Sequence, residues 1–352
     1  MTLVLKSSVN AVKGIPPSSG YKGPSDYVTF ADFSKGMYIK NGVAVALSNI
    51  LTSPSQTSGT VVSDKYHNIG VSPAGVPRIG YIPAYGIYGV QSETSNKGCT
   101  VGSDFFFQGN SLNTAYAVYS NKGSLSFDKT KVNFLGGTGN ITDPYIFRRK
   151  SDSPSSIRFT TSRPDVRVYS IMCVGNRVPL SISKDGDVLS DSDLVLDVNG
   201  IDRSNFTMVF RTVSPRLGTV LGNPLGYVPV VKFYGDNNSS FSFIKVRGVS
   251  LNVRVVSNGA TKVEINEAAP VNADIDTYAI SCSNGVMSCY MNGAKIDMKN
   301  GITSLAGFLL NGVKILSADS QWSVAKYCDH LVNAIVYNRA LSSKELSECV
   351  FV

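Results

Sequence analysis

Charged residues are scarce in this chain, and several residue types that carry chemistry are nearly absent. Only 16% of the 352 residues are charged, two are histidine and one is tryptophan; an average globular chain has roughly 25% charged residues. The six cysteines form no Cys-x-x-Cys pair and no cluster with histidine. Low charge with a 43% hydrophobic fraction argues against intrinsic disorder. The cysteine and histidine pattern argues against a structural zinc site.

Long apolar runs are also missing. No stretch approaches the roughly 18–20 residues needed to cross a bilayer. The first residues carry only the short apolar run Leu3-Val-Leu5, far less than the core of a secretory signal. We therefore expect that the protein does not insert into a membrane. We also expect that it is made in a cytosol, where buried cysteines stay as free thiols.

The net charge of +8 raises the question of a nucleic-acid partner. The basic residues are scattered, however, and the densest cluster is Arg148-Arg149-Lys150. A surface that tracks phosphates has a richer stripe of Lys and Arg interleaved with aromatic residues. The sequence thus predicts a mildly basic surface and no nucleic-acid partner. An acidic protein or a polyanionic glycan fits the excess charge equally well.

The length and the turn residues indicate two folded units behind an arm. Residues 1–25 hold a Pro/Gly-rich run that excludes helix, so we predict an extended arm, either a linker or a segment lying on a neighbouring subunit. Residues 26–150 are predicted to form a β-rich, Gly/Tyr-rich attachment domain. The turn-rich run before residue 151 indicates a boundary, and residues 151–352 are predicted to form a second domain.

Short strands separated by turns dominate the second unit, and several alternate apolar and polar residues. The predicted strands are 166–172, 194–198, 206–210, 228–233, 241–246, 251–256 and 261–265. One helix is expected at 342–349, where Ser342 as N-cap and Glu345 form a capping box. The fold class is therefore mostly β, with a sandwich or jelly roll in the second unit.

Two segments resemble the family of laminin G-like and concanavalin A-like lectin/glucanase domains. In residues 276–295, Asn284-Gly285 and Asn292-Gly293 supply two hairpin turns that require positive φ. Residues 329–346 are similar to the family's closing strand, followed by Tyr-Asn-Arg-Ala-Leu-Ser and a short helix. The resemblance implies a concanavalin A-like jelly-roll sandwich, preceded by a smaller β-rich domain and the arm. Leu331, Ile335 and Tyr337 are expected on one face of the last strand.

The resemblance also raises the question of a calcium site, because many relatives bind Ca²⁺ through acidic and carbonyl oxygens at the sandwich edge. The best local candidates are Asp185, Asp187 and Asp191. Aspartates are common in solvated turns, and that is the alternative. We expect no cofactor unless these residues hold calcium.

For a ligand, the candidate residues are Trp322, Asp319 and Asn292. Trp322 lies in the loop 318–323, where an exposed indole can stack on a sugar ring or anchor a protein; core packing is the alternative.

Catalysis is not expected from this sequence. Glucanase relatives carry paired carboxylates along one strand, because glycoside hydrolysis needs two facing acids. The nearest pair, Glu264 and Glu267, has a spacing that places the two residues on opposite faces of a strand. The histidines and serines form no triad pattern, and Gly136-Gly-Thr-Gly139 is a turn rather than a phosphate loop.

The organisation as a whole looks like that of a structural protein from the virion of a tailed bacteriophage, in capsid decoration, collar, baseplate or fibre. This implies attachment to other virion proteins through the N-terminal part, a homo-oligomer, and location in the virion after synthesis in the host cytoplasm. The alternative is a carbohydrate-binding, receptor-recognition protein directed at a host-surface glycan.

Overall fold

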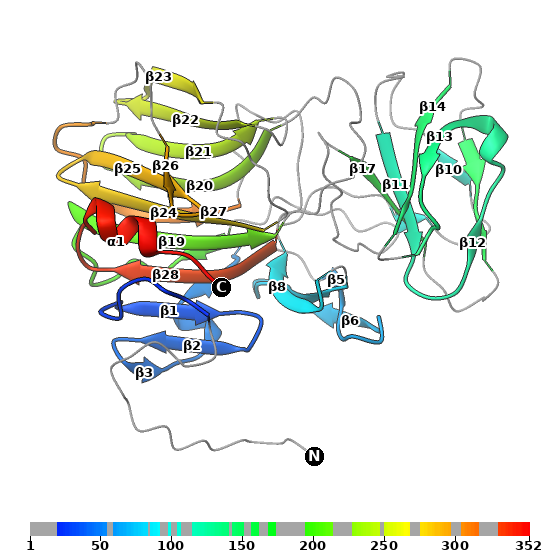
Figure 1. Ribbon diagram of the computed structural model, residues 1–352, viewed down its shortest axis with the longest axis horizontal. Coiled ribbons are helices and arrows are strands. Elements are labelled where there is room, and N and C mark those ends of the chain that lie inside the picture. Colours follow the sequence, from blue (N-terminus) through cyan, green and yellow to red (C-terminus); the bar gives the residue numbers. More distant parts are fainter. Residues whose placement is uncertain are drawn as a thin grey trace.

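The chain is described by a computed structural model over residues 20–54, 59–83, 85–91, 98–99, 104–106, 115–140, 143–150, 156–161, 168–173, 194–213, 227–246, 250–267, 275–296, 304–316 and 330–352. This part consists mainly of antiparallel strands, with one short α-helix, α1 (Ser343–Glu348) (Figure 1). The mostly-β fold class is confirmed. Within the described ranges, no helix is long and apolar enough to span a membrane.

Two large sheets form a β-sandwich. Across the ten-stranded sheet the order is β26 (Ala294–Lys295), β25 (Val286–Met291), β24 (Ile275–Ser283), β19 (Asn205–Val213), β28 (His330–Tyr337), β1 (Thr29–Asp32), β2 (Met37–Lys40) and β3 (Val43–Ala44), with β8 (Ile87–Gln91) beside β28 and β7 (Ile79–Ile82) beside β8. Across the seven-stranded sheet it is β23 (Ala260–Glu267), β22 (Ser250–Ser257), β21 (Ser240–Val246), β20 (Tyr227–Gly235), β27 (Leu310–Ile315), β18 (Leu194–Leu196) and β4 (Leu51–Thr52).

The core of the sandwich lies between these sheets and follows from the alternation along each strand. Phe206 and Phe210 of β19 point inward from the ten-stranded sheet, and Phe233 and Phe243 point inward from the seven-stranded sheet. The rings of Phe206 and Phe233 meet across the interface with centroids 5.7 Å apart. Each such fully buried side chain contributes about 1.5–3 kcal/mol of transfer free energy.

Both sheets include strands from the start of the chain, which differs from the predicted division at residue 150. β1 pairs with the closing strand β28, and β4 pairs with β18. Residues 29–52 therefore belong to the sandwich rather than to a separate domain. A short strand's local pattern shows that it is a strand, but not which distant strand it pairs with.

A smaller β-unit is inserted between β8 and β18. Its five-stranded sheet has the order β13 (Val132–Gly136), β14 (Tyr145–Arg149), β11 (Ala115–Ser120), β17 (Val168–Cys173) and β9 (Gly98–Cys99). Two further pairs are β10 (Asp104–Phe106) with β15 (Ser156–Arg158) and β12 (Leu125–Ser126) with β16 (Thr160–Thr161). These pairings cross the predicted boundary at 150/151, because strands after it complete sheets begun before it. The remaining elements are the hairpin β5 (Gly59–Val62) and β6 (Ile69–Ser72) and the 3₁₀ turns η1 (Leu47–Asn49) and η2 (Lys129–Lys131).

The inserted unit has its own aromatic core. The ring of Phe127 lies 5.1–5.4 Å from those of Tyr145, Phe147 and Phe159. On another side of the unit, Ile146 packs in a buried cluster with sandwich residues that include Val213.

The outer face of the ten-stranded sheet is covered by the chain itself. Leu346 of α1 packs with Ile335 and Tyr337 of β28, two residues that the sequence predicts on one face of this strand. Leu331 is the exception and faces the sandwich core. The register between β19 and β28 shifts next to Leu331, and such a bulge reverses the facing of the residues beyond it.

The predicted hairpin turns and capping box are confirmed. Asn284 and Asn292 adopt φ of 48° and 52°, each followed by a glycine at about +80°. Ser342 and Glu345 make both bonds of the capping box. Cys282 and Cys289 do not face each other: Cys282 pairs with Met287, and both thiols are free.

Candidate functional site

Five of the six predicted site residues lie outside the described residues. These are the calcium candidates Asp185, Asp187 and Asp191 and the ligand candidates Asp319 and Trp322. Their roles stay predictions. Within the described ranges, no group of three or more His, Cys, Asp or Glu side chains is placed to hold a metal ion.

Asn292, the sixth, lies in the turn between β25 and β26. Its Oδ1 accepts a hydrogen bond from the Thr277 N–H (2.7 Å), and its Nδ2 donates to Oδ1 of the buried Asp276 (3.2 Å). The side-chain amide therefore fastens the turn to the start of β24. A ligand contact by Asn292 stays a prediction.

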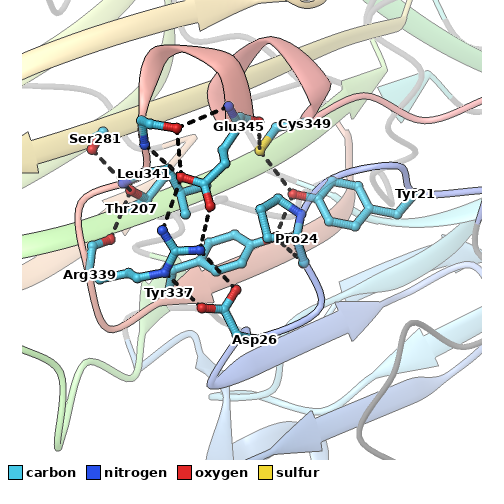
Figure 2. A network of polar contacts seen from close by, with 11 residues as sticks. Tyr21, Pro24, Asp26, Thr207, Ser281, Tyr337, Arg339, Leu341, Glu345 and Cys349 are labelled. Atoms are coloured by element: carbon cyan, nitrogen blue, oxygen red, sulfur yellow. Dashed lines mark hydrogen bonds and ion pairs between the residues drawn. The ribbon is translucent and has the colours of Figure 1, made fainter.

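The network in Figure 2 centres on Arg339, which follows the closing strand β28. The guanidinium forms bidentate pairs with Asp26 (2.7 and 3.1 Å) and with Glu345 of α1 (2.7 and 3.1 Å). Hydrogen bonds from Arg339 are the main cause that lowers the pKa of Glu345 to about 2, and they also lower the pKa of Asp26. This network ties the first described segment to the last strand and helix, so its role is architectural.

A second part of that network holds buried hydroxyl and thiol groups. The Tyr21 hydroxyl lies 2.7 Å from that of Tyr337 and donates to Sγ of Cys349 at 3.1 Å, while Tyr337 donates to the Pro24 carbonyl at 2.8 Å (Figure 2). Burial raises the pKa of the Cys349 thiol to about 11. A protonated thiol held this way is a packing group rather than a nucleophile.

A hollow of about 230 Å³ lies on the seven-stranded sheet, on the side away from the sandwich core. Residues of β20, β21, β22 and two turns line it, among them Lys232, Tyr234, Asn238, Ser240, Arg254 and Gly259. The alternation of side chains along β20 explains why Lys232 and Tyr234 face the hollow. Val231 and Phe233 enter the core, so Lys232 and Tyr234 stand on the opposite face.

Two turns rich in asparagine close one end of the hollow. Asn237 and Asn238 lie in left-handed backbone conformations between β20 and β21, and Asn258-Gly259 do so between β22 and β23. The Gly259 N–H donates to the Asn238 carbonyl (3.2 Å), which joins the turns. This wall of the hollow is therefore set by backbone geometry.

Basic residues surround the aromatic ring in the hollow. The Nζ atoms of Lys232 and Lys314 lie 4.8 and 5.6 Å from the centroid of the Tyr234 ring. Lys314 of β27 is the register partner of Lys232. Asp236, which follows β20, is paired with Arg203 at 3.0 Å and so has a counterion of its own.

The row continues across the sheet. Lys232 pairs in register with Ser242 of β21, and Ser242 pairs with Arg254 of β22. Arg254 is buried and donates to Thr261 Oγ1 at 2.8 Å, and its register partner in β23 is Glu264. Three cationic residues and a serine thus occupy one line on the outer face, and Glu264 continues this line on β23.

Two polar atoms near this row lack a hydrogen-bonding partner within the part of the chain that the structure describes. They are Oγ of Ser242, whose residue is 3% exposed, and Oδ1 of Asn252, whose residue is 4% exposed. A buried polar atom without a partner costs about 1–3 kcal/mol. Such groups call for an explanation, such as local strain, a bound water or ion, or a functional role.

Similarity to known proteins is confined to the fold. No family model matches the chain, and no curated protein is similar to it in sequence. Solved structures similar to it include the CBM40 domain of Ruminococcus gnavus IT-sialidase bound to α2,3-sialyllactose (14% identity, 43% of this chain and 84% of that chain, TM-score 0.32). A second is Trypanosoma rangeli sialidase with the inhibitor DANA (15% identity, 50% of this chain and 28% of that chain, TM-score 0.34). A third is the binding domain of botulinum neurotoxin serotype D (11% identity, 45% of this chain and 40% of that chain, TM-score 0.33). Identities and TM-scores this low carry no conclusion about function. The class defined by the chain's own two sheets is the antiparallel β-sandwich.

Sequence reasoning missed Lys232, Tyr234 and Arg254. The predicted strands 228–233 and 251–256 contain Lys232 and Arg254, and their alternation places both residues opposite the apolar positions; Tyr234 lies one residue beyond the first predicted strand. The register that brings them into one row depends on pairing between strands, which the local pattern does not contain.

Proposed function

We propose that the protein is a non-catalytic carbohydrate-binding protein whose ligand lies in the hollow on the outer face of the seven-stranded sheet. The observation that carries the proposal is Tyr234, an aromatic ring in a polar hollow bordered by basic side chains. A sugar has an apolar face that packs on an aromatic ring and hydroxyls that bond to polar neighbours. The volume of about 230 Å³ is below the roughly 300–1,000 Å³ of pockets for drug-sized ligands. It suits a single sugar unit of a longer glycan.

Two further features support binding at this face. The outer face of the other sheet is covered by α1 and the terminal segments, as the cluster around Ile335 shows. The turns at Asn238 and Gly259 fix the wall of the hollow, so little ordering is needed when a ligand binds.

We propose binding without catalysis because the described residues that line the hollow include no acid. Glycoside hydrolysis needs two carboxyl groups, roughly 5–10 Å apart, around the scissile bond. Location in a phage particle, contacts with other virion proteins and a homo-oligomer remain predictions from the chain's organisation.

The test is a glycan array probed with the full chain and two tyrosine variants. We expect Tyr234→Ala to lose the array signal at least tenfold, because the stacking surface is removed. Tyr66→Ala is the matched control, since Tyr66 is 69% exposed and lies between β5 and β6, away from the hollow. Absence of any glycan signal, or equal signals from both variants, would overturn the proposal.

A further inference from the structure

We propose that the ligand carries a carboxylated sugar, whose carboxylate binds between Lys232 and Arg254 over the hydroxyl of Ser242. This inference rests on the proposed function and names the class of sugar. It starts from register: the three residues are direct neighbours on β20, β21 and β22. Adjacent strands lie about 4.8 Å apart, so the two cationic residues stand roughly 10 Å apart with the serine midway.

The hydroxyl of Ser242 identifies the chemistry that fits between them. It is buried, and none of the described residues provides it with a hydrogen-bonding partner. A hydroxyl can donate one hydrogen bond, and with a cationic residue on either side the complementary acceptor is an anion. A carboxylate oxygen placed there accepts from Ser242, and the charged side chains provide charge-assisted bonds.

Asn252 adds a second requirement. It lies two residues before Arg254 on β22, so it is on the same face and about 6.6 Å along the strand. Its Oδ1 is a buried acceptor without a partner. The complementary ligand group is a donor, such as a sugar hydroxyl or an N-acyl N–H.

Three successive rows therefore recognise different parts of one ligand. Tyr234 lies two residues beyond Lys232 on β20 and provides the stacking row. The row of Lys232, Ser242 and Arg254 binds the carboxylate, and Asn252 binds a donor one row further. The rows span about 13 Å, the length of a short oligosaccharide rather than of one sugar.

Ser242 and Asn252 are buried beside the hollow and are not among the residues that line it, so the inference requires the side chains next to them to move when the ligand binds. The register neighbours of Ser242 are the long side chains of Lys232 and Arg254. Lys232 is half-buried and its stem is flexible, so it is the side chain of the two that moves more easily, whereas Arg254 is buried.

Calorimetric titration of the full chain tests the inference, with sialyllactose and trigalacturonate as acidic probes and lactose and trigalactose as neutral ones. We expect at least one acidic probe to bind ten or more times as tightly as its neutral counterpart. Which acidic probe binds distinguishes a sialic acid from a uronic acid. Raising NaCl from about 50 to about 500 mM should weaken the acidic probe alone, because salt screens the charged row.

The variants locate the carboxylate. Ser242→Ala changes one buried atom and is expected to weaken the acidic probe about tenfold, with the neutral probe changed less than twofold. Lys232→Met should likewise weaken binding of the acidic probe and leave binding of the neutral probe almost unchanged. Lys344→Met, on the exposed side of α1, serves as the control and should change the affinity for neither probe. A circular dichroism melt for each variant confirms that it is folded.

The outcomes separate the two proposals. Equal affinity for acidic and neutral probes overturns the carboxylate inference and leaves carbohydrate binding standing. A preference for the acidic probe that Ser242→Ala does not reduce overturns the assigned location. If none of the probes binds while the array gives a neutral glycan, the carboxylate inference also fails. If the array too gives nothing, the proposed function fails with it.

Discussion

Arg339 shows how one residue can hold three segments of the chain together. Its guanidinium bonds to Asp26 before β1 and to Glu345 in α1, while its own carbonyl accepts from Thr207 of β19 (3.0 Å). The planar guanidinium of arginine can form bidentate pairs with two carboxylates at once, whereas the lysine ammonium cannot.

Replacement of Arg339 by alanine should make the free energy of unfolding depend less on pH in the acidic range. The pKa of Glu345 is about 2 in the folded protein against an ordinary 4.5, so the pair stabilises the fold above about pH 4.5 and this contribution disappears as the pH falls toward 2. At pH 7 we expect Arg339→Ala to lower the free energy of unfolding by on the order of 1 kcal/mol, since the pairs are partly exposed.

Urea denaturation between pH 2 and pH 7 measures the effect. The difference in the free energy of unfolding between the unsubstituted protein and Arg339→Ala should narrow steadily below about pH 4.5. Lys344→Ala is the control and should follow the unsubstituted protein at every pH. A difference that stays constant down to pH 2 would contradict the assigned role of Arg339.

The buried thiols give a second prediction at this scale. Burial raises the pKa of Cys282 and of Cys349 to about 11, and it also raises the pKa of Cys289. At pH 8 the three thiols are therefore protonated as well as covered, and alkylating agents react with thiolates. We expect peptide mapping after treatment with iodoacetamide to find them unmodified in the native protein and fully modified in urea. Native labelling of Cys349 at the rate of a free thiol would contradict its burial under Tyr21.

At the scale of elements, α1 was the easiest to predict. Its start is set by the side chains of Ser342 and Glu345, two residues three apart in sequence, and the structure has both bonds of the box. The Asn-Gly turns were predictable for the same reason, because positive φ is a local demand. The facing of Leu331 was not predictable, since a bulge opposite Thr212 depends on the partner strand.

Removal of the cap should loosen the helix and the network behind it. Ser342→Ala loses one bond of the box, and we expect a loss of about 1 kcal/mol in the free energy of unfolding. Ser343→Ala, one position later and exposed, is the matched control and should change stability little. Thermal melts of the two variants compare them directly; equal melting temperatures would show that the capping box is dispensable.

At the scale of the whole molecule, the sandwich is assembled from both ends of the chain around an inserted unit. The second-half strands were predictable from their alternation, but the contribution of residues 29–52 was not, because it depends on pairings more than a hundred residues apart. The candidate site shares this origin. Lys232, Ser242 and Arg254 are unremarkable in sequence and become a row only through register.

This assembly makes the predicted domain 151–352 an incomplete sandwich. Without β1 and β4, strands β28 and β18 lose a neighbour, and the core loses the buried residues Ala31 and Leu51. We expect fragment 151–352 to aggregate or to melt without a cooperative transition. Addition of residues 20–54 as a separate peptide should restore part of the cooperative transition. A fragment that melts cooperatively at the temperature of the full chain would show that the early strands are dispensable.

The central claim is that a glycan binds on the outer face of the seven-stranded sheet. Hydrogen–deuterium exchange of the full chain, with and without a saturating glycan taken from the array, tests it most directly. We predict that binding slows exchange in peptides covering residues 232–242 and 252–259, and leaves β19 and β28 unchanged. Slower exchange confined to peptides around Trp322, with residues 232–242 unaffected, would contradict the claim and place the ligand in the loop that the sequence had suggested.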